Sequence, residues 1–345
     1  MMKTIAAVFA AVAAACLPVA AVSQDEDPDR PYEGPVIDVH LHAAGAEDNG
    51  PAPNAVCPSL AADLRYTGST PWPVVMTQIA QNPTCDDPIR GPATDAEVQQ
   101  QTIAQLEERA VIAILSSQRD EFAQWSAAAP GLFLRGHPFN LSWDDAPTAA
   151  ELAEAYDRGE FQVLAEVTNQ YAGVLADDPA FAAYWDMAAE KGIPVGLHLG
   201  PGPPGAPALY PEFRVQSPLA IEEVLRTRPN LRVYLMHAGW PFVDDLKAML
   251  YLYPQLYVDT GVLQLAATRA EYHAFLEELV DAGFVDRIMF GSDQMNWPGM
   301  IGEGIDAINE APFLTYEQKR AILHDNAARF LAPELADHAA ANAAR

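Results

Sequence analysis

Short hydrophobic runs alternate with amphipathic stretches along most of this chain. The first run, VIDVHLH at residues 36–42, is rich in β-branched residues and has the period-two alternation of a strand. Seven more runs of strand length follow, at residues 110–117, 132–139, 161–168, 193–200, 231–239, 256–261 and 287–293. Helical patterns lie between them, for example at residues 180–192 and 269–283. Hydrophobic strands separated by helices predict a parallel sheet covered on both faces, and eight such units predict a closed (β/α)₈ TIM-type barrel.

Several segments fall outside this alternation. Residues 24–35 are polar and rich in proline, which predicts a linker before a barrel domain at residues 36–331. Residues 43–93 are rich in Pro, Gly, Asn and Asp, so we expect a long lid-like insertion after the first strand. A helical pattern at residues 315–331 predicts an extra C-terminal helix outside the barrel. We expect residues 332–345 to be a disordered tail.

Residues 1–23 are typical of a secretory signal peptide. Lys3 precedes an apolar run over residues 5–22, and Ser23 ends a small-residue cleavage site. A membrane anchor is the alternative, but the run contains Pro18 and is short of the ~20 apolar residues of a span. We therefore predict a periplasmic or secreted protein with no membrane contact after cleavage.

The chain has three cysteines. Cys16 lies in the signal segment, where lipidation is an alternative that the small residues before it disfavour. Cys57 and Cys85 lie 28 positions apart in the 43–93 insertion. In an oxidising compartment such a pair favours a disulfide over two buried thiols.

The charge of the chain limits its partners. The formal net charge is −27, and removal of Lys3 makes it one unit more negative. Such a field repels nucleic acid and anionic membranes, so we expect neither as a partner. A small-molecule substrate fits, and the sequence leaves a homo-oligomer open.

The first strand carries a candidate metal-binding pair. His40 and His42 are two residues apart, so their side chains leave one face of the strand about 7 Å apart and could share one ion. Asp38 precedes them by the same spacing, which predicts a carboxylate that orients the pair from one layer deeper.

Four more potential ligands occur at the ends of later strands. Glu166 ends the fourth strand, His198 the fifth, His237 the sixth and Asp293 the eighth. Barrel active sites are built at these C-terminal strand ends. A lone histidine there is often a core residue, and Glu166 could instead orient a ligand, but together the residues predict a divalent metal site. Zn²⁺ is the expected ion and Mn²⁺ the alternative.

The ordered motifs resemble the amidohydrolase superfamily. The D-x-H-x-H pattern in VIDVHLH, then His198, His237 and the GSD at 291–293, is similar to the amidohydrolase-2 branch. The resemblance covers residues 36–331, and NAARFL at 326–331 looks like the terminal helix of these barrels. It implies a metal-dependent hydrolase or a non-oxidative decarboxylase. Glu166 also resembles the fourth-strand glutamate of TatD-like hydrolases, which contributes to a two-metal site.

One departure from the superfamily limits the metal site. Many members bridge two metals with a carboxylated lysine on strand four, but the lysines of this chain are Lys3, Lys191, Lys247 and Lys319, none of them at a strand end. The site is therefore either mononuclear or bridged by Glu166.

These residues predict a hydrolytic mechanism. A bound divalent ion lowers the pKa of water toward ~7. Asp293 would accept the proton of that water, while His237 would polarise the substrate carbonyl or bind a second ion. The alternatives are a decarboxylase that uses the same ligands and a barrel that only binds a metal or ligand.

Residues near the strand ends also predict a substrate pocket. We expect lining from the loop at 200–214 and from Asn169, Tyr171, Trp240 and Trp297, although each aromatic could equally be rim packing. Arg135 and His137 end the third strand and could bind a substrate carboxylate.

Overall fold

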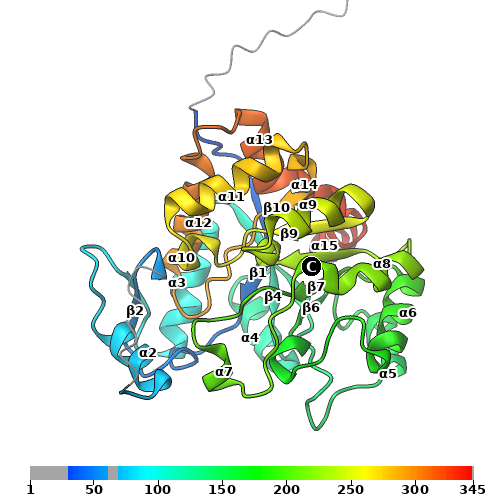
Figure 1. The fold of residues 1–345 in the computed structure, drawn as a ribbon, viewed down its shortest axis with the longest axis horizontal. Helices are drawn as coiled ribbons and strands as arrows, with labels where there is room; N and C mark the ends of the chain where they lie inside the picture. The colour runs from blue at the N-terminus through cyan, green and yellow to red at the C-terminus, as the bar shows by residue number, and fades with distance from the viewer. Residues whose placement is uncertain (1–29, 61–68, 344–345) are drawn as a thin grey trace, which may run out of the picture.

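The computed structural model describes residues 30–60 and 69–343. Eight strands lie at its centre, with helices packed around them (Figure 1). They are β1 (Val36–His42), β4 (Val111–Ser116), β5 (Phe133–Gly136), β6 (Leu164–Val167), β7 (Val195–His198), β8 (Val233–Met236), β9 (Leu256–Asp259) and β10 (Ile288–Met289). Each strand lies within one of the predicted runs.

The eight strands form two parallel sheets, and hydrogen bonds join the edge strands of one sheet to those of the other on both sides. One sheet has the order β1-β4-β5 and the other β10-β9-β8-β7-β6. Parallel bridges of Gly136 with Val163 and of Phe139 with Val167 connect the β5 and β6 chains. On the other side, the Val39 amide donates to the Phe290 carbonyl at 3.0 Å. This cyclic order is that of the predicted TIM-type barrel.

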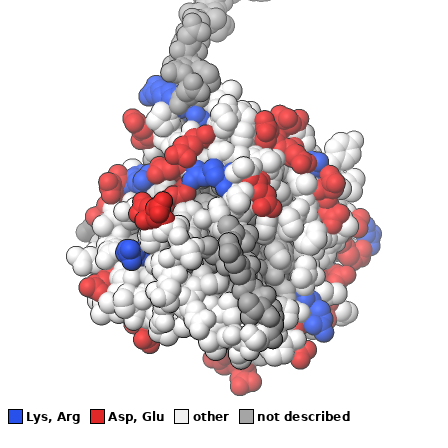
Figure 2. Space-filling model, turned by 60° about the vertical axis from the view of Figure 1, so that its left-hand side comes forward, with Lys and Arg blue, Asp and Glu red and all other residues white. Residues whose placement is uncertain are grey.

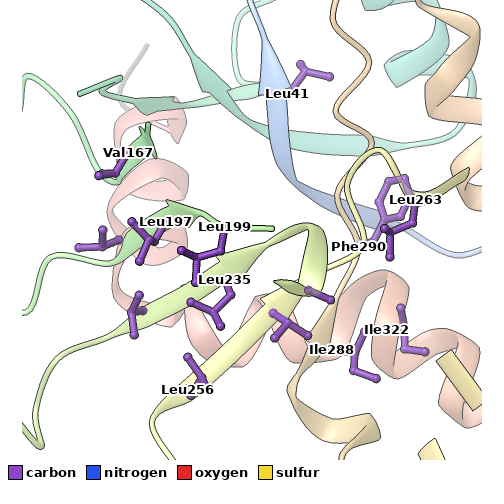
Figure 3. Packing of buried hydrophobic residues seen from close by; sticks show 14 of the residues in the cluster. Leu41, Val167, Leu197, Leu199, Leu235, Leu256, Leu263, Ile288, Phe290 and Ile322 are labelled. Atoms are coloured by element: carbon purple, nitrogen blue, oxygen red, sulfur yellow. The ribbon is translucent and has the colours of Figure 1, made fainter. Parts of the chain in front are cut away.

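Helices follow the strands around the outside. After each strand in turn, the main helix is α3 (Asp95–Glu108), α4 (Arg119–Ala128), α5 (Ala149–Asp157), α6 (Ala182–Lys191), α8 (Glu222–Thr227), α9 (Val243–Leu252), α11 (Arg269–Asp281) or α12 (Gly299–Asn309). Thr94, Thr148 and Thr268 start three of them, each accepting a hydrogen bond from a first-turn amide. Leucine and isoleucine side chains of neighbouring strands form the buried layer beneath the helices, including Leu197, Leu235, Leu256 and Ile288 (Figure 3).

The C-terminal region closes the inside of the barrel. Residues 316–330 form α13 (Tyr316–Arg320), a π-helical turn η6 (Ala321–Asp325) and α14 (Asn326–Phe330). Ala327, Phe330 and Leu331 join the buried cluster of Leu134 and Tyr234. The predicted extra helix therefore completes the inner core instead of only packing outside it.

The prediction of a disordered tail at residues 332–345 is wrong for residues 332–343, which the structure describes. Residues Ala332–Ala343 form helix α15. Arg232 makes a two-pronged ion pair with the buried Glu334, at 2.7 and 2.8 Å, and His338 contacts the Gly131 carbonyl. An alanine-rich segment has high helix propensity, and these contacts fix it against the barrel.

The described residues of the 43–93 insertion form a small unit beside the barrel. It contains β2 (Ala55–Val56), α2 (Trp72–Gln81) and β3 (Ile89–Arg90), while residues 61–68 lie outside the described part. Cys57 and Cys85 form the predicted disulfide, with an S–S distance of 2.14 Å. The unit packs on Trp297 and Met300 near α12. Figure 1 shows α2 near the short helix α7 (Ala206–Leu209), where the Trp72 indole donates to the Pro204 carbonyl.

The structure describes only part of the N-terminal segment for which predictions were made. The signal peptide, Cys16 and residues 24–29 of the linker lie outside the described residues. The end of the linker is not free, because Tyr32 is buried and its amide donates to the Asn309 side chain at 2.8 Å. Across residues 30–60 and 69–343, no helix is long and apolar enough to cross a membrane.

Candidate metal centre

A cavity of about 820 Å³ opens at the C-terminal ends of the strands. Five of the six predicted ligands line it: His42, Glu166, His198, His237 and Asp293. The sixth, His40, lies directly beneath them with 1% of its surface exposed. The structure therefore brings all six together, and we refer to them as the ligand cluster.

Two members of the ligand cluster have an unusual backbone conformation. His237 directly follows β8 with φ 58°, and Asp293 follows β10 with φ 46°. Residues other than glycine rarely adopt positive φ, and such positions concentrate at functional sites. Hydrogen bonds hold both in place, from the His237 amide to Asp259 Oδ1 at 3.0 Å and from the Asp293 amide to the His40 carbonyl at 2.8 Å.

One half of the ligand cluster is centred on Asp293. Its Oδ1 lies 3.1 Å from Nε2 of His42 and 3.7 Å from Nε2 of His40. The potential ligand atoms of these three side chains all lie within 4.8 Å of one another. This spacing allows one ion to contact all three.

The other half consists of Glu166, His198 and His237, whose ligand atoms also lie within 4.8 Å of one another. The Glu166 carboxylate spans the two halves. Its Oε1 lies 3.7 Å from His198 Nε2, and its Oε2 lies 3.7 Å from His42 Nε2. Glu166 is thus in contact distance of ligands on both sides.

The donor set fits a divalent metal ion. His40 Nε2 is buried and has no hydrogen-bond partner among the described residues. A buried polar atom without a partner is costly, and a metal ion would satisfy it. Imidazole nitrogens together with carboxylate oxygens are ligands of first-row divalent ions. The ligand cluster is therefore a candidate divalent metal site.

Electrostatics favour the metal-binding protonation states of His198 and Asp293. At His40, burial alone would lower the pKa, but Asp293 and Asp259 outweigh burial and raise the pKa to about 10, so a metal ion must displace a proton from that ring. Burial, reinforced by the nearby His237, holds the pKa of His198 well below its usual value, so this ring is neutral. Burial alone would raise the pKa of Asp293, but His40 and His42 lower it far below its usual value. A neutral imidazole and an ionised carboxylate are the forms that coordinate a metal.

Asp259, which the sequence analysis missed, orients two histidines. Its Oδ2 lies 3.1 Å from His40 Nδ1, and its Oδ1 accepts from the amides of His237 and Gly261. The Gly261 carbonyl lies 3.0 Å from His237 Nδ1, which leaves Nε2 of this ring free to coordinate. The signal was present, because Asp259 ends the predicted strand in LYVDTG.

Two glycines make room for His40. A Cβ atom at Gly261 would lie 2.7 Å from His40 Nδ1, and one at Gly291 would lie 2.8 Å from His40 Cβ. Both distances are below normal contact. Glycine in the DTG and GSD segments thus allows the backbone to approach the imidazole closely.

Asp38 does not orient the imidazoles as predicted. It is buried and accepts hydrogen bonds from the His40 and Ser292 amides, at 2.9 and 3.0 Å. The strand register shifts between Asp38 and Leu41, and Ile37 and Val39 pack into the inner core. Strict alternation therefore fails here, and Asp38 ties the β1 backbone to the GSD segment instead.

The predicted 200–214 loop lines the cavity through Leu209, Tyr210, Pro211 and Glu212. Of the four single residues predicted beside it, Tyr171 lines the cavity, and its hydroxyl lies 3.0 Å from His198 Nε2. Asn169 is buried and accepts from the Leu141 amide. Trp297 is buried and donates to Asn54, while Trp240 packs against the outer core. These three are structural, which corrects the prediction.

Arg135 and His137 also lie away from the cavity. Arg135 donates to the Glu160 carbonyl at 2.6 Å, and its guanidinium lies over the Phe122 ring. His137 stacks on Phe161, and burial lowers its pKa to about 4. Leu134 points into the barrel, so strand alternation turns Arg135 toward the helices.

The outer cavity contains residues that the sequence analysis did not identify. Asp48 and Trp143 are two of them. Together with Tyr210 and Glu212, which lie in the 200–214 loop that was expected to line the pocket, we call them the rim residues. Of the 43–93 insertion, the described residues that line the cavity are Ala43, Ala44, Asp48 and Asn49. No lysine or arginine of the described chain is among the lining residues.

Solved structures share this fold at low identity. An uncharacterised TIM-barrel protein from Bordetella bronchiseptica is 18% identical with a TM-score of 0.55, covering 87% of this chain and 99% of its own. A probable 2-pyrone-4,6-dicarboxylic acid hydrolase from Acinetobacter baumannii is 15% identical with a TM-score of 0.52, covering 87% and 100%. A 5-carboxyvanillate decarboxylase from Sphingomonas paucimobilis is 15% identical with a TM-score of 0.52, covering 86% and 99%.

The sequence itself gives the family. No curated protein sequence matches the chain. A family model described as Amidohydrolase matches residues 37–332. This range contains the whole ligand cluster and all the strands, apart from Val36 at the start of β1. The chain therefore belongs to the amidohydrolase family and is an enzyme of that family.

Proposed function

We propose that this enzyme is a metal-dependent hydrolase that activates water for attack on a small organic substrate such as a lactone, ester or amide. The observation that carries this proposal is the charge of the cavity. Its acidic lining residues are Asp48, Glu166, Glu212 and Asp293, and no lysine or arginine of the described residues is among the lining. A decarboxylase must hold a substrate carboxylate, and apart from a metal ion this lining offers no cation to bind one.

We propose zinc as the metal, with manganese as the alternative. His40, His42 and His198 with Glu166 would supply three nitrogens and one oxygen, a set that zinc favours. His237 and Asp293 lie close enough to complete the set or to hold a second ion. Because the two Glu166 oxygens face His42 and His198, Glu166 would help to hold an ion in either half of the ligand cluster.

The roles of the side chains follow from their positions. A divalent ion held here would supply a Lewis acid that acidifies water and polarises a carbonyl. Asp293 takes a proton from the attacking water as the water oxygen bonds to the substrate carbonyl carbon. The bond to the leaving group then breaks, and Asp293 returns the proton to the leaving oxygen or nitrogen. His237, at the cavity wall, would polarise the carbonyl oxygen or bind the second ion.

Tyr171 is a second candidate for polarising the substrate. Burial raises the pKa of its hydroxyl well above the usual value, so it remains a donor. The hydroxyl lies 3.0 Å from His198 Nε2. When that nitrogen coordinates a metal, the hydroxyl is free to donate to a substrate oxygen.

We also propose that the enzyme is periplasmic or secreted. The signal-like residues 1–23 support this, as does the Cys57–Cys85 disulfide, because disulfides persist in oxidising compartments.

The proposal is tested by screening zinc- and manganese-loaded protein. Lactones, esters, amides and phosphodiesters are assayed for hydrolysis, and aromatic carboxylic acids for release of carbon dioxide. The His40→Ala variant gives the background. We expect hydrolysis of at least one neutral substrate class. Carbon dioxide release without any hydrolysis would identify a lyase instead.

A further inference from the structure

The outer half of the cavity exposes aromatic rings to solvent. Trp143 is 39% exposed and Tyr210 is 42% exposed, and both line the cavity. Large rings left open in a catalytic cavity are typical of contact surfaces for a ligand. Their faces carry partial negative charge and attract cations.

Two carboxylates line the same cavity as these rings. Asp48 and Glu212 are exposed and line the same cavity, and neither forms an ion pair with a described residue. Asp48 uses Oδ2 to accept from the Gly45 amide at 2.8 Å, which leaves Oδ1 open. Arg214, the nearest cation in sequence, donates to the carbonyls of Glu212 and Phe213 and does not line the cavity.

The backbone that carries Tyr210 and Glu212 is held in place. The Tyr171 ring packs on Tyr210 with centroids 4.6 Å apart. Gly173, at φ 73°, lies so close to the Glu212 carbonyl that a Cβ atom would approach it to 2.5 Å. Gly200 pairs with Gln216 across the base of this loop at 3.0 Å. The rim is thus largely preformed, which lowers the entropy cost of binding.

We propose that the substrate carries a positively charged, ammonium-type group. This group binds in the outer cavity, where Glu212, Asp48, Tyr210 and Trp143 are part of the lining, while the bond to be hydrolysed lies at the ligand cluster. The inference rests on the proposed hydrolase function and specifies its substrate class. Two features favour a cationic group over a neutral one: the negative charge of the carboxylates, and the partial negative charge on the faces of the aromatic rings.

Acidic side chains alone do not support this inference. They are spread over much of the surface, as Figure 2 shows for one face, and the net charge is −27. The rim differs from that surface because its carboxylates lie beside exposed rings inside the catalytic cavity.

Two molecules of equal shape test the inference. Choline carries a quaternary ammonium group, and 3,3-dimethylbutanol is its uncharged counterpart. Calorimetric titration of the zinc-loaded protein should show that choline binds about tenfold more tightly. Glu212→Gln and Asp48→Asn should each reduce this preference about two- to fivefold. Glu277→Gln removes an exposed carboxylate of α11 outside the cavity, and it should leave the preference unchanged.

Equal binding of the two molecules would overturn the inference, as would rim variants that behave like Glu277→Gln. Hydrolysis of neutral lactones and esters is measured on the same samples. Hydrolysis without a choline preference refutes the cation site alone. A choline preference without hydrolysis of any substrate refutes the proposed hydrolase and leaves the binding site in place.

Discussion

The inner and outer halves of the cavity are built differently. The inner half is buried, and its side chains leave strands or the residues just after them, each fixed by contacts such as Asp259 with His40 at 3.1 Å. The outer half lies on loops, and its rings and carboxylates are exposed. Barrel enzymes commonly keep their chemistry on strand ends and vary their specificity on loops. Changes in the inner half should therefore affect the metal and turnover, and changes in the outer half should affect substrate choice.

The largest effect is expected from His40→Ala. This change removes a buried ligand that sits between Asp259 and Asp293. Metal content should fall sharply and hydrolysis should drop to background, because the remaining ligands no longer enclose the ion. Elemental analysis of the mature protein, which should give about one or two ions per chain in the wild type, measures the loss.

A matched control comes from the other side of the barrel. His137→Ala removes a partly buried histidine that stacks on Phe161 outside the cavity. It should retain the metal. If His40→Ala kept full metal and activity, the ligand cluster would not be a metal site.

Asp293→Asn should have the next largest effect. As a base, Asp293 acts through its proton, so the variant should retain most of the metal while kcat falls by ~10² or more. Metal content and turnover are measured on the same sample. A metal loss that parallels the loss of activity would make Asp293 mainly a ligand. Full activity with full metal would remove the base from the mechanism.

Glu166→Gln tests the junction between the two halves of the ligand cluster. A bridging carboxylate would lose one of two ions, whereas a carboxylate that only orients His42 and His198 would not.

The inner half could be predicted from the sequence because it follows strand periodicity. Hydrophobic runs located all eight strands, and the polar residues at their ends gave the six members of the ligand cluster. The prediction was wrong where periodicity was ignored or fails. Arg135 faces the helices, because side chains alternate along a strand and its neighbour Leu134 faces the barrel interior. In β1, a register shift moves Asp38 away from the face of the strand that carries the two imidazole rings.

The outer half could be predicted only in part, because the 200–214 loop was expected at the pocket but Trp143 and the exact lining positions were not. Trp143 and Tyr210 lie in segments without periodicity, and their position depends on loop contacts such as Tyr210 with Tyr171. The sequence predicts Trp297 as a residue of the substrate pocket, yet Trp297 is buried against the 43–93 insertion. The course of this insertion cannot be predicted from hydrophobic periodicity, because the segment has none.

Asp259→Asn should show a smaller effect within the inner half. The amide would weaken the contact that orients His40 and would change the proton balance of that ring. Metal affinity should fall about 10- to 100-fold while the protein still folds and binds metal at excess. Competition with a chelator measures it. Asp281→Asn, at the exposed end of α11, is the control and should match the wild type. An unchanged affinity in Asp259→Asn would mean that Asp259 supports only the backbone.

The smallest effect is expected from Tyr171→Phe, at the boundary between the two halves. Its ring packs on Tyr210, while its hydroxyl points to His198. The phenylalanine keeps the packing and removes only the donor. Because a metal ion would share the polarisation of the substrate oxygen, kcat should fall only about tenfold. KM and metal content should stay near the wild type.

Tyr184→Phe is the matched control for this change. It removes a hydroxyl that donates to the Pro147 carbonyl outside the cavity, so turnover should not change. A rise in KM without a fall in kcat would assign Tyr171 to the outer half, as a residue that binds the substrate equally in its ground and transition states. A fall in kcat with constant KM would assign its hydroxyl to the chemistry of the inner half, because only a contact that strengthens in the transition state lowers kcat in this way.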